Sequence, residues 1–347
     1  MNELIFYKTA DNSTGLYNNL VKDIYHSKTG ALKEAFEKFI YPINLKNILT
    51  NKNNINVLDI CSGILYNTKA LISSINDDVK ANIDCIDKNK ELSILAPFIS
   101  DSLFNESINL KILNQLLENG ITMDEIILCL KLYYTPENFS FFLPFTSYFI
   151  NFIKNLPYKN NLHCQNKRFL HNIYYEYIST SMNKRSSLNE YENLRLNFEF
   201  CDARNFIKKT DTIYDIIFLD GFSPQKDPCL WSEDFIKELS SHLNYNSIIV
   251  SYSKSTPFRA ALLNSNLFVG KTFIENVDSG TIASNNPQNI NFKLSDFDLN
   301  LINTRCGITY KDKNLNLSPS EIISNRKLEQ NTSSRVSSTK FLKSLKK

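Results

Sequence analysis

Short apolar runs bounded by turn residues recur along the chain, and they are the strongest sign of its fold. Stretches with helical periodicity lie between most of these runs. Because strands that alternate with helices form parallel sheets covered by helices, the pattern predicts a doubly wound α/β domain. Five runs have the length and the β-branched or aromatic content of buried strands: Ile55–Ile60, Ala81–Asp87, Leu196–Cys201, Tyr214–Asp220 and Ser247–Ser253.

One gap between the predicted strands is too long for a simple crossover. Residues 88–195 separate the second run from the third, whereas an ordinary helical crossover needs far fewer residues. The gap contains amphipathic stretches such as MDEIILCLKLYY and SYFINFIKNL, which indicate helices. We therefore expect a mostly helical insertion at about 91–195, between the second and third strands.

The pattern weakens towards both ends of the chain. We expect a helix from about Ala31 to Phe39, one or two further strands after Lys271, and a helix near Ser318–Asn331. The predicted organisation has four parts: an N-terminal lead-in at 1–50, a domain at 51–290 that holds the sheet and the insertion, a C-terminal extension at 291–331, and a flexible basic tail at 332–347.

The composition is that of an ordinary globular chain, with 42% hydrophobic and 22% charged residues. The seven cysteines form no CxxC pair, so we interpret them as reduced core residues and expect neither a disulfide framework nor a metal site. The first residues lack the pattern of a secretion signal, and the longest apolar patch, near Phe141–Ile150, is too short to cross a membrane. We expect a cytoplasmic protein with no membrane contact.

The charge is unevenly distributed along the chain. Residues 326–347 hold seven basic residues and one acidic residue, a charge of +6, so residues 1–325 carry −3 of the net +3. A basic segment on a slightly acidic body favours electrostatic attachment to a polyanion such as RNA. The alternative, which charge alone leaves equally open, is a solvated terminus without a partner.

Four of the five predicted strands end at or beside an aspartate. Any one of these carboxylates alone is explained as a helix cap. Together they fit one ligand, because an acid at the second strand can bind ribose hydroxyls and an acid after the third can accept from an adenine amino group. The set, which predicts an adenosine-containing cofactor, is Asp59, Asp87, Asp202 and Asp220.

The loop after the first strand helps to choose the cofactor. Gly63 lets the backbone approach a ligand closely, but the loop CSGIL at 61–65 lacks the Gly-x-Gly-x-x-Gly fingerprint of dinucleotide binding. S-adenosylmethionine has no pyrophosphate and tolerates a loop with fewer glycines. We therefore favour S-adenosylmethionine, with NAD as the alternative.

Three longer motifs resemble one family. LDGFSPQKDPCLW, with FCDAR upstream and YHSKTGALKEA near the start, is similar to the methyltransferase domain of the MnmC family of tRNA-modifying enzymes. The similarity extends from about Thr9 to about Phe268, and pieces such as SGTIAS resemble the C-terminal extension of stand-alone members. The resemblance implies a Rossmann-like sheet, S-adenosylmethionine as cofactor, and tRNA as partner, bound at its anticodon stem-loop.

The family's reaction is methylation of the 5-aminomethyl group of the wobble (thio)uridine, which gives 5-methylaminomethyl(-2-thio)uridine. The resemblance implies that Asp220 is the catalytic residue beside the target amine. The cofactor-binding positions that it implies are Asp59, Gly63, Asp87, Asp202, Tyr25 and Ser27. The substrate-binding positions that we predict are His26, Gly221, Phe222, Pro224, Lys226 and Trp231.

Two positions depart from the family's pattern. Cys61 and Leu65 stand where glycines are expected on either side of Gly63. A side chain at Leu65 can crowd the methionine moiety of the cofactor, and the sequence leaves open whether the two departures weaken cofactor binding. The chain also has neither the length nor a second glycine-rich fingerprint for the flavin-dependent oxidase domain of bifunctional members, so we expect that activity to be absent.

Asp220 has a chemical task that follows from the substrate. Methyl transfer needs an amine with a free lone pair, held in line with the methyl group. A carboxylate beside the amine favours its charged form, so we assign Asp220 mainly to orientation, as the acceptor of a hydrogen bond from the amine. Proton loss to water, or to Asp220 with a raised pKa, stays open.

Several predicted site residues have a structural alternative. Trp231 can stack on the uridine or close the start of the next helix. Lys226 can meet a tRNA phosphate or stay solvated, and His26 can relay a proton or be structural. Gly221 allows a close turn that a proline stiffens, and the aromatic segment 171–179 can offer stacking surfaces for a flipped base or form a half-buried element.

Two other functions fit the same sequence. One is a related S-adenosylmethionine-dependent enzyme that acts on another amine, such as a protein or a polyamine. The other is a tRNA-binding relative whose loop at 61–65 no longer holds the cofactor. The sequence leaves open which tRNAs are used, whether the base must be thiolated, and the oligomeric state.

Overall fold

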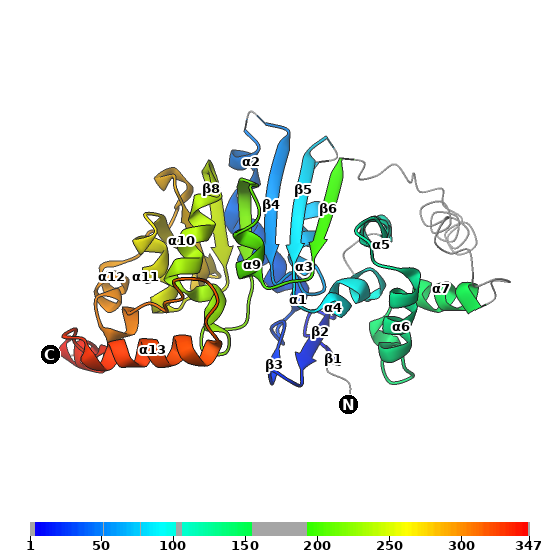
Figure 1. Cartoon of the computed structure of the whole chain (residues 1–347). Helices are drawn as coiled ribbons and strands as arrows, with labels where there is room; N and C mark the ends of the chain where they lie inside the picture. Colours follow the sequence, from blue (N-terminus) through cyan, green and yellow to red (C-terminus); the bar gives the residue numbers. More distant parts are fainter. Residues whose placement is uncertain (1–3, 51, 77, 102–105, 155–192, 346–347) are drawn as a thin grey trace. The chain divides into compact units, whose positions relative to one another are not determined.

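The computed structural model describes residues 4–50, 52–76, 78–101, 106–154 and 193–345. The chain divides into two structural units, whose elements are labelled in Figure 1. Unit 1 comprises Met1–Ala35 and Ser62–Phe200, and unit 2 comprises Phe36–Cys61 and Cys201–Lys347.

The five predicted strands are all present, and two more follow them. Seven strands form one mixed sheet in the order β6-β5-β4-β7-β8-β10-β9, with helices beside it. This confirms the predicted α/β fold class. The strands are β4 (Asn54–Ile60), β5 (Lys80–Ile86), β6 (Leu194–Glu199), β7 (Tyr214–Leu219), β8 (Leu243–Ser251), β9 (Phe268–Ile274) and β10 (Val277–Ser284).

In unit 2, the apolar run at Tyr214–Leu219 forms the central strand, β7. β7 pairs in parallel with β4 on one side and with β8 on the other, and all six of its residues are buried. A strand covered on both faces needs a continuous apolar run rather than alternation. β10 then runs antiparallel to β8 and β9, and the two-residue turn Glu275–Asn276 has φ values of 49° and 66°, as a tight hairpin requires.

Unit 1 holds a parallel strand pair and a small separate sheet. β5 and β6 pair in parallel, with Ala81 opposite Leu194. The predicted lead-in contains a three-stranded antiparallel sheet of β1 (Leu4–Lys8), β2 (Thr14–Asn18) and β3 (Asp23–Ile24).

The helices follow the predicted alternation. Those of unit 1 are α1 (Ala31–Glu34), α3 (Tyr66–Ile72), α4 (Lys90–Leu95), η3 (Ala96–Phe98), α5 (Glu106–Glu118), α6 (Met123–Tyr133), η4 (Phe139–Phe141) and α7 (Pro144–Lys154). Unit 2 has η2 (Tyr41–Ile43), α2 (Leu45–Ile48), α9 (Ala203–Ile207), η6 (Pro228–Trp231), α10 (Glu233–Ser241), α11 (Thr256–Asn264), η7 (Pro287–Asn289), α12 (Asp296–Ile302), η8 (Arg305–Gly307), α13 (Pro319–Thr332) and α14 (Ser338–Ser344). The helical segment η1 (Ala35–Ile40) continues directly from α1, so the helix expected over 31–39 is present.

Reciprocal capping explains where several of these helices begin. Thr122 and Glu125 form a capping box at the start of α6, and Ser318 and Glu321 do so at the start of α13. Each box satisfies two backbone N–H groups that the first turn leaves unpaired. Among the described helices, none combines the length and the apolar character that a bilayer crossing demands.

The predicted insertion at about 91–195 is described only in part. Its described residues form α4 to α7, all of them helical elements. Residues 155–192 lie outside the described residues, and so does the aromatic segment 171–179. The insertion as a whole therefore stays a prediction.

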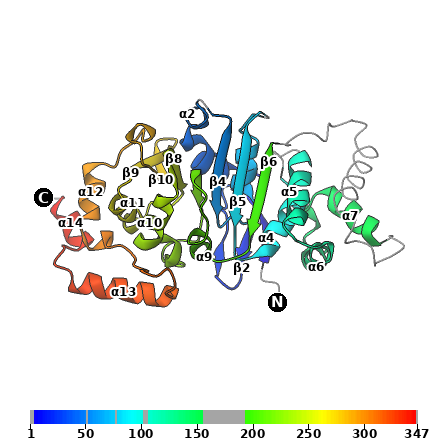
Figure 2. The same ribbon diagram turned by 45° about the horizontal axis from the view of Figure 1, so that its top comes forward.

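The segment from 332 that we expected to be a flexible tail contains a helix, α14, and is tied to unit 2. The backbone N–H of Arg305 donates to the carbonyl of Val336 at 2.9 Å, and its Nε donates to the carbonyl of Arg335 at 2.9 Å. The Phe341 ring of α14 lies 6.0 Å from that of Phe297, and α14 lies beside α12 in Figure 2. Charge and composition suggested a loose terminus, but these apolar and backbone contacts depend on the fold.

Candidate active site

The loop that follows β4 meets the end of β5 in unit 1. The backbone N–H of Gly63 donates to Asp87 Oδ2 at 3.0 Å, and the N–H of Asn89 donates to Asp87 Oδ1 at 2.8 Å. Desolvation raises the pKa of the Asp87 carboxyl, and these backbone hydrogen bonds partly counteract the rise. The structure therefore brings together two of the predicted cofactor residues and holds the carboxylate through backbone groups.

The two positions that lack the expected glycines keep a glycine-like backbone. Cys61, Gly63 and Leu65 have φ values of 61°, 54° and 67°, all in the left-handed region. Non-glycine residues adopt this region at a cost of about 1–2 kcal/mol each, so the surrounding structure enforces the loop shape. The loop geometry does not need glycine at either position.

The burial of Leu65 bears on whether its side chain can crowd the cofactor. The Leu65 side chain is fully buried, with 0% of its surface exposed. A side chain without contact to solvent cannot project into a cleft that is open to a cofactor. The burial of Leu65 therefore favours packing in the core over contact with the methionine moiety, and the effect of Leu65 on cofactor binding stays a prediction.

The YHS segment, residues 25–27, is built into the lead-in of unit 1. The Tyr25 hydroxyl accepts a hydrogen bond from Asn18 Nδ2 at 2.7 Å. The Ser27 N–H donates to Glu34 Oε2 at 2.8 Å, and the Ser27 hydroxyl lies 2.7 Å from that of Thr29. The segment is thus held by local polar contacts.

His26 connects the YHS segment with the helix that follows the glycine loop. Its ring lies edge-on to the ring of Tyr66, the first residue of α3, at 5.0 Å. The Tyr66 hydroxyl is held by the backbone of Thr14. Desolvation lowers the pKa of His26 to about 4, so its imidazole is neutral at pH 7. In unit 1, His26 therefore belongs to the same region as the Gly63 loop.

Two buried polar atoms of this region have no hydrogen-bond partner among the described residues. They are the hydroxyl oxygen of Ser62, whose residue is 6% exposed, and Nε2 of His26. Buried polar atoms usually form hydrogen bonds, so atoms without a protein partner in this loop can bond to a polar group of a ligand. The residues of unit 1 thus fit a polar ligand at the loop.

The ends of β4 and β7 place Asp220 beside the start of the same loop. The N–H of Asp220 donates to the carbonyl of Ile60 at 3.2 Å. A Cβ atom added to Gly221 would lie 3.6 Å from Sγ of Cys61. Asp59, one residue before Ile60, is fully buried, so direct contact of its carboxylate with a cofactor would need a rearrangement.

The segment after Asp220 is packed more tightly than a purely substrate-facing loop. Trp231 is fully buried, donates from Nε1 to the carbonyl of Phe222 at 2.8 Å, and meets the Phe258 ring edge-on at 4.9 Å. These contacts favour the alternative of packing, and stacking on the uridine stays an untested prediction. An added Cβ at Gly221 would lie 2.9 Å from Leu230, which explains the glycine by space rather than by substrate contact.

The remaining predicted residues of this segment are divided between core and surface. Pro224 is buried, in agreement with a stiffened turn, while Lys226 is exposed. The carbonyl of Gly221 accepts from the Tyr252 hydroxyl at 2.8 Å, a contact that supports the Asp220 turn from β8's end. The exposure of Lys226 therefore fits both alternatives, contact with a tRNA phosphate and solvation.

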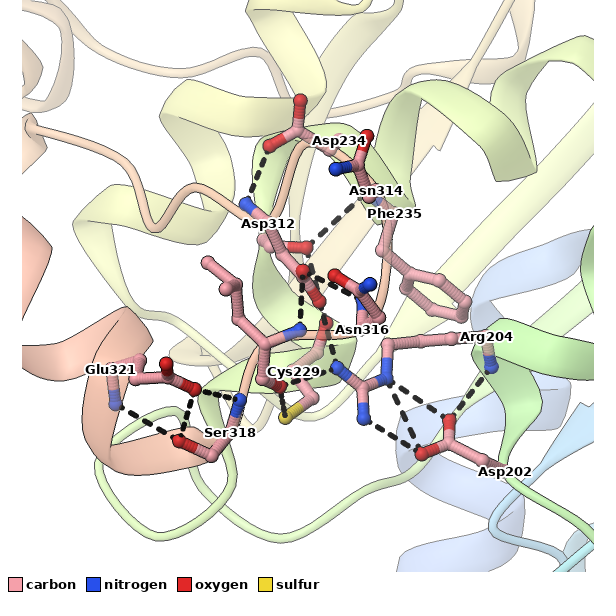
Figure 3. Close-up of polar contacts among 12 residues, drawn as sticks. Asp202, Arg204, Cys229, Asp234, Phe235, Asp312, Asn314, Asn316, Ser318 and Glu321 are labelled. Atoms are coloured by element: carbon pink, nitrogen blue, oxygen red, sulfur yellow. Dashed lines mark hydrogen bonds and ion pairs between the residues drawn. The ribbon is translucent and has the colours of Figure 1, made fainter.

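Asp202 is part of a polar cluster that the sequence did not reveal (Figure 3). It caps α9 by accepting from the N–H of Arg204 at 2.9 Å, and it forms an ion pair with Nη2 of Arg204 at 2.8 Å. Nη1 of Arg204 reaches Asp312 Oδ2 at 2.7 Å and the carbonyl of Leu317 at 2.8 Å. Burial works to lower the pKa of Arg204, but the hydrogen bonds to both carboxylates raise it above its usual range.

Comparison with known proteins shows what parts of this chain are similar to. Residues 165–274 match a family described as S-adenosyl-L-methionine-dependent methyltransferase. Two relatives are named tRNA 5-methylaminomethyl-2-thiouridine biosynthesis bifunctional protein MnmC. The one from Campylobacter hominis is 32% identical over 81 residues, and the one from Campylobacter concisus is 31% identical over 77 residues. Part of the chain is therefore similar to S-adenosyl-L-methionine-dependent methyltransferases and to the MnmC proteins.

The matches differ in how much of the chain they cover. The matches to the two bifunctional proteins cover 23% and 22% of this chain and 12% of each relative. The uncharacterized protein MJ0670 of Methanocaldococcus jannaschii is 27% identical over 329 residues, which is 93% of this chain and 72% of that protein. The crystal structure of MNMC2 from Aquifex aeolicus covers 95% of this chain and 86% of its own, with a TM-score of 0.62 and 21% identity. At that identity the likeness shows the fold alone.

The candidate site also contains contacts that sequence reasoning missed. Arg204 stands two residues after Asp202 in the FCDAR motif, which pointed to the region but not to the ion pair. Tyr66, Tyr252 and Asp312 carried no motif signal. Each acts through a contact with a residue far away in the sequence, and such contacts become visible only in the fold.

Proposed function

We propose that this chain transfers a methyl group from S-adenosylmethionine to the 5-aminomethyl group of the wobble (thio)uridine in tRNA, giving 5-methylaminomethyl(-2-thio)uridine. The observation that carries the proposal is the position of Asp220. Its backbone is bonded to the end of β4, from which the Gly63 loop leaves, and it opens the LDGF segment that resembles the MnmC family. Relatives named for the biosynthesis of this nucleoside support the substrate. A tRNA substrate also fits the expected cytoplasmic location.

The residues of unit 1 suit the cofactor. The Asp87 carboxylate can accept from ribose hydroxyls, and the backbone of Gly63 leaves room for a close approach. The unpartnered hydroxyl of Ser62 and Nε2 of His26 are available for polar groups of the ligand, among the described residues. The cofactor would supply a methyl group bound to a sulfonium sulfur, which makes that carbon electrophilic. Tyr25 and Ser27 stay predictions as cofactor residues.

Asp220 orients the substrate in this proposal. With lysine as the model, an alkylamine has a pKa near 10.4, so its neutral form at pH 7 lies roughly 4.6 kcal/mol away. A carboxylate beside the amine makes this cost larger rather than smaller. Asp220 therefore acts by accepting a hydrogen bond from the amine, so that the nitrogen lone pair faces the methyl carbon. The nitrogen loses one proton to water or to Asp220 as the N–C bond forms.

Two surfaces fit the phosphates of tRNA. The exposed Lys226 follows Asp220 in the same segment. Near the C-terminus, the exposed basic residues on helices are Lys327, Lys340 and Lys343, and Arg335 is exposed between α13 and α14. Each cation that neutralises a phosphate adds to the salt dependence of binding, so these surfaces predict an affinity that falls steeply with salt. Phe222 and Pro224 stay predictions as contacts to the nucleoside.

The decisive experiment combines transfer with product analysis. The purified chain is incubated with S-adenosylmethionine carrying a labelled methyl group and with tRNA from a strain that lacks this methylation. The tRNA is then digested and its nucleosides are separated. We expect label in 5-methylaminomethyl(-2-thio)uridine. Asp220→Ala should abolish transfer but leave S-adenosylhomocysteine affinity within about threefold, and Asp211→Asn, an exposed acid before β7, is the matched control.

Other results would favour the two alternatives. Cofactor binding without transfer to tRNA would point to another amine as the acceptor, and labelled protein or polyamine would then identify it. If neither S-adenosylmethionine nor S-adenosylhomocysteine raises the melting temperature while tRNA still binds, the chain is a tRNA-binding relative without catalysis. Loss of cofactor binding in a folded Asp220→Ala variant would contradict the role given to Asp220.

A further inference from the structure

Unit 2 contains a groove with a volume of about 520 Å³, in the range of about 300–1,000 Å³ that small-molecule sites occupy. Its lining comes mainly from two parts of the chain: the segment from η1 to Asn44, and β9 with the segment that follows η7. Three aromatic residues line it, namely Tyr41, Phe273 and Phe292. The groove thus brings together aromatic side chains from both parts.

The aromatic rings of the groove are unusually exposed for side chains of their size. The exposed fraction is 70% for Tyr41, 57% for Phe292 and 37% for Phe273. Phe273 and Phe292 meet edge-to-face, with ring centroids 4.9 Å apart. Scattered apolar residues are common on protein surfaces, but apolar side chains that gather in one groove mark a binding surface. The groove therefore offers aromatic surface to a ligand.

The backbone fixes the position of Phe292 beside β9. Its carbonyl accepts from the N–H of Lys271 at 2.8 Å, and Lys293 forms an antiparallel bridge with Gly270. A Cβ atom added to Gly270 would lie 2.5 Å from the carbonyl oxygen of Phe292, so the glycine allows the two segments to approach closely. Phe292 is therefore held by paired backbone rather than by a loose loop.

The polar residues of the groove suit a nucleobase better than a phosphate. The lining includes two asparagines, Asn44 and Asn291, and the acid Glu275, and all three are exposed. Amides both donate and accept, whereas a carboxylate accepts from an exocyclic amino group and repels a phosphate. Lys271 also lines the groove, but its Nζ forms an ion pair with Asp298 Oδ2 at 2.6 Å. A carboxylate of the protein therefore already balances its charge.

A short series of contacts connects the groove with the Asp220 turn of the same unit. Lys38 follows the lining residue Glu37 in η1, and its Nζ lies 5.8 Å from the ring centroid of Tyr252. The Tyr252 hydroxyl donates to the carbonyl of Gly221, the residue after Asp220. The segment that lines the groove thus contacts the residue that supports the Asp220 turn.

The sheet register shows how close these two places are. Thr281 of β10 pairs with Ser251 of β8 on one side and with Lys271 of β9 on the other. Neighbouring strands lie about 4.8 Å apart, so the backbone of Lys271 is about 10 Å from that of Ser251, which precedes Tyr252. A single RNA strand can therefore reach the Asp220 turn with one nucleotide and the groove with a neighbouring one.

We propose that the groove binds an unpaired base of the tRNA that neighbours the target nucleotide, stacked on Tyr41 and Phe292. The inference rests on the proposed function, which places the target amine beside Asp220. Because every base has a π-face, stacking holds the strand with little dependence on its sequence. The groove thus anchors the anticodon loop on one side of the target base, while Asp220 orients the amine.

The test removes single bases from the RNA. Anticodon stem-loops with an abasic site at one loop position at a time are titrated with the full chain, and fluorescence anisotropy gives their affinities. At one position next to the target, we expect the missing base to weaken binding to the unmodified chain by about tenfold. The double variant Tyr41→Ala with Phe292→Ala should bind the intact stem-loop about tenfold more weakly. In that variant, the same abasic site should weaken binding by no more than about twofold, because its stacking partners are already absent.

Milder variants guard against misfolding. Tyr41→Phe keeps the ring and should bind as the unmodified chain does, whereas Tyr41→Leu keeps an apolar side chain without a ring and should weaken binding. Tyr245→Ala removes a ring that is 73% exposed on β8, outside the groove, and this matched control should leave the affinity unchanged. Unchanged affinity in the groove variants, or an abasic effect that persists in them at every loop position, would overturn the inference.

The assay separates this inference from the proposed function, because it measures binding, whereas the labelled nucleoside assay measures methyl transfer. Methyl transfer to tRNA together with unchanged affinity in the groove variants would refute the groove and keep the function. A position-specific abasic effect that the groove variants lose, without methyl transfer, would keep the groove and refute the function. A chain that binds no tRNA would refute both.

Discussion

Two strand-end carboxylates, Asp87 and Asp202, are held in opposite ways. Asp87 accepts from the backbone N–H groups of Gly63 and Asn89, which belong to its own turn and to the preceding loop. Asp202 is held by Arg204, which is in turn held by Asp312, 108 residues further along the chain. The first arrangement needs only a short loop in the right conformation, and the second needs the C-terminal extension to be folded.

The difference predicts which perturbations each carboxylate tolerates. Backbone donors cannot be removed by substituting a side chain, so the Asp87 turn should keep its shape in most variants. The Asp202 cluster contains a buried charge network, and such a network fails when one partner is removed. We therefore expect substitutions in the Asp202 cluster to lower the free energy of unfolding. Substitutions at the Asp87 turn should mainly lower the affinity for the ligand.

The largest effect should follow from breaking the cluster at its buried end. Asp312→Ala leaves the Arg204 guanidinium without its buried partner and two backbone N–H groups without an acceptor. We expect the free energy of unfolding to fall by about 3–5 kcal/mol, as when one member of a buried ion pair is removed. Urea unfolding measures it.

The double variant Arg204→Met with Asp312→Leu is the matched control for that loss. It removes both charges and fills the space with apolar groups, so it should recover a large part of the stability. If the double variant is less stable than Asp312→Ala alone, the buried charge is not the source of the loss.

A second test uses His26, whose Nε2 atom is buried, in the region of the Asp87 turn. Because the folded-state pKa of His26 is lowered from 6.5 to about 4, the unfolded state takes up the proton first as the pH falls. The stability contribution is complete above pH 6.5 and is lost progressively towards pH 4, by up to about 3 kcal/mol. His26→Gln should flatten this part of the pH dependence of urea unfolding. The equivalent change His242→Gln is the control, and an equal slope in the wild type and His26→Gln would contradict the lowered pKa of His26.

A third variant tests ligand binding at the Asp87 turn while the fold is kept. Asp87→Asn keeps one acceptor oxygen but loses the charge and the second acceptor, so hydrogen bonds to the ribose hydroxyls weaken. We expect S-adenosylhomocysteine to bind with about 1.5–3 kcal/mol less free energy, measured by calorimetry. The exposed acid Asp78, changed to Asn, serves as the control. Unchanged affinity in the Asp87 variant would remove this residue from the cofactor site.

The smallest effect concerns the strained loop. Cys61→Gly relieves a left-handed conformation that costs a non-glycine residue about 1–2 kcal/mol in the folded state. The glycine also raises the conformational entropy of the unfolded chain, which lowers the gain by about 0.4–1 kcal/mol. We expect a gain in the free energy of unfolding of up to about 1 kcal/mol. Asn266→Gly, at φ 60°, is the control and should gain less, because asparagine tolerates this region. A clear loss in the free energy of unfolding would show that packing of the Cys61 thiol stabilises the fold.

The strands were predictable because burial leaves a local mark. β4, β5 and β7 lie within one residue of the predicted runs at each end. β8 begins at Leu243, four residues before the predicted Ser247, because Asn244, Tyr245 and Asn246 are exposed and leave no apolar signal. A strand that extends beyond the buried part of its sheet cannot be recognised from its hydrophobicity.

The places of the strand-end carboxylates were predictable from their positions along the chain. Asp87 and Asp220 follow apolar strands, and the ends of parallel strands are where ligands bind. The directions of Leu65 and Trp231 were not predictable, because the same side chain can face a ligand or the core. In the structure both are fully buried, and the surrounding fold alone decides this.

The sequence by itself determined the α/β alternation, the acids at the strand ends and the capping of helices such as α13, since each depends on residues close together in the chain. The tertiary structure decided that Arg204 meets Asp312, that Tyr252 supports Gly221, and that the C-terminal segment is anchored by Arg305. These contacts join residues that are far apart in sequence, and no local pattern encodes which distant partner will be brought to them. Their energies arise from burial and from the low dielectric around paired charges, which exist only after the chain has folded.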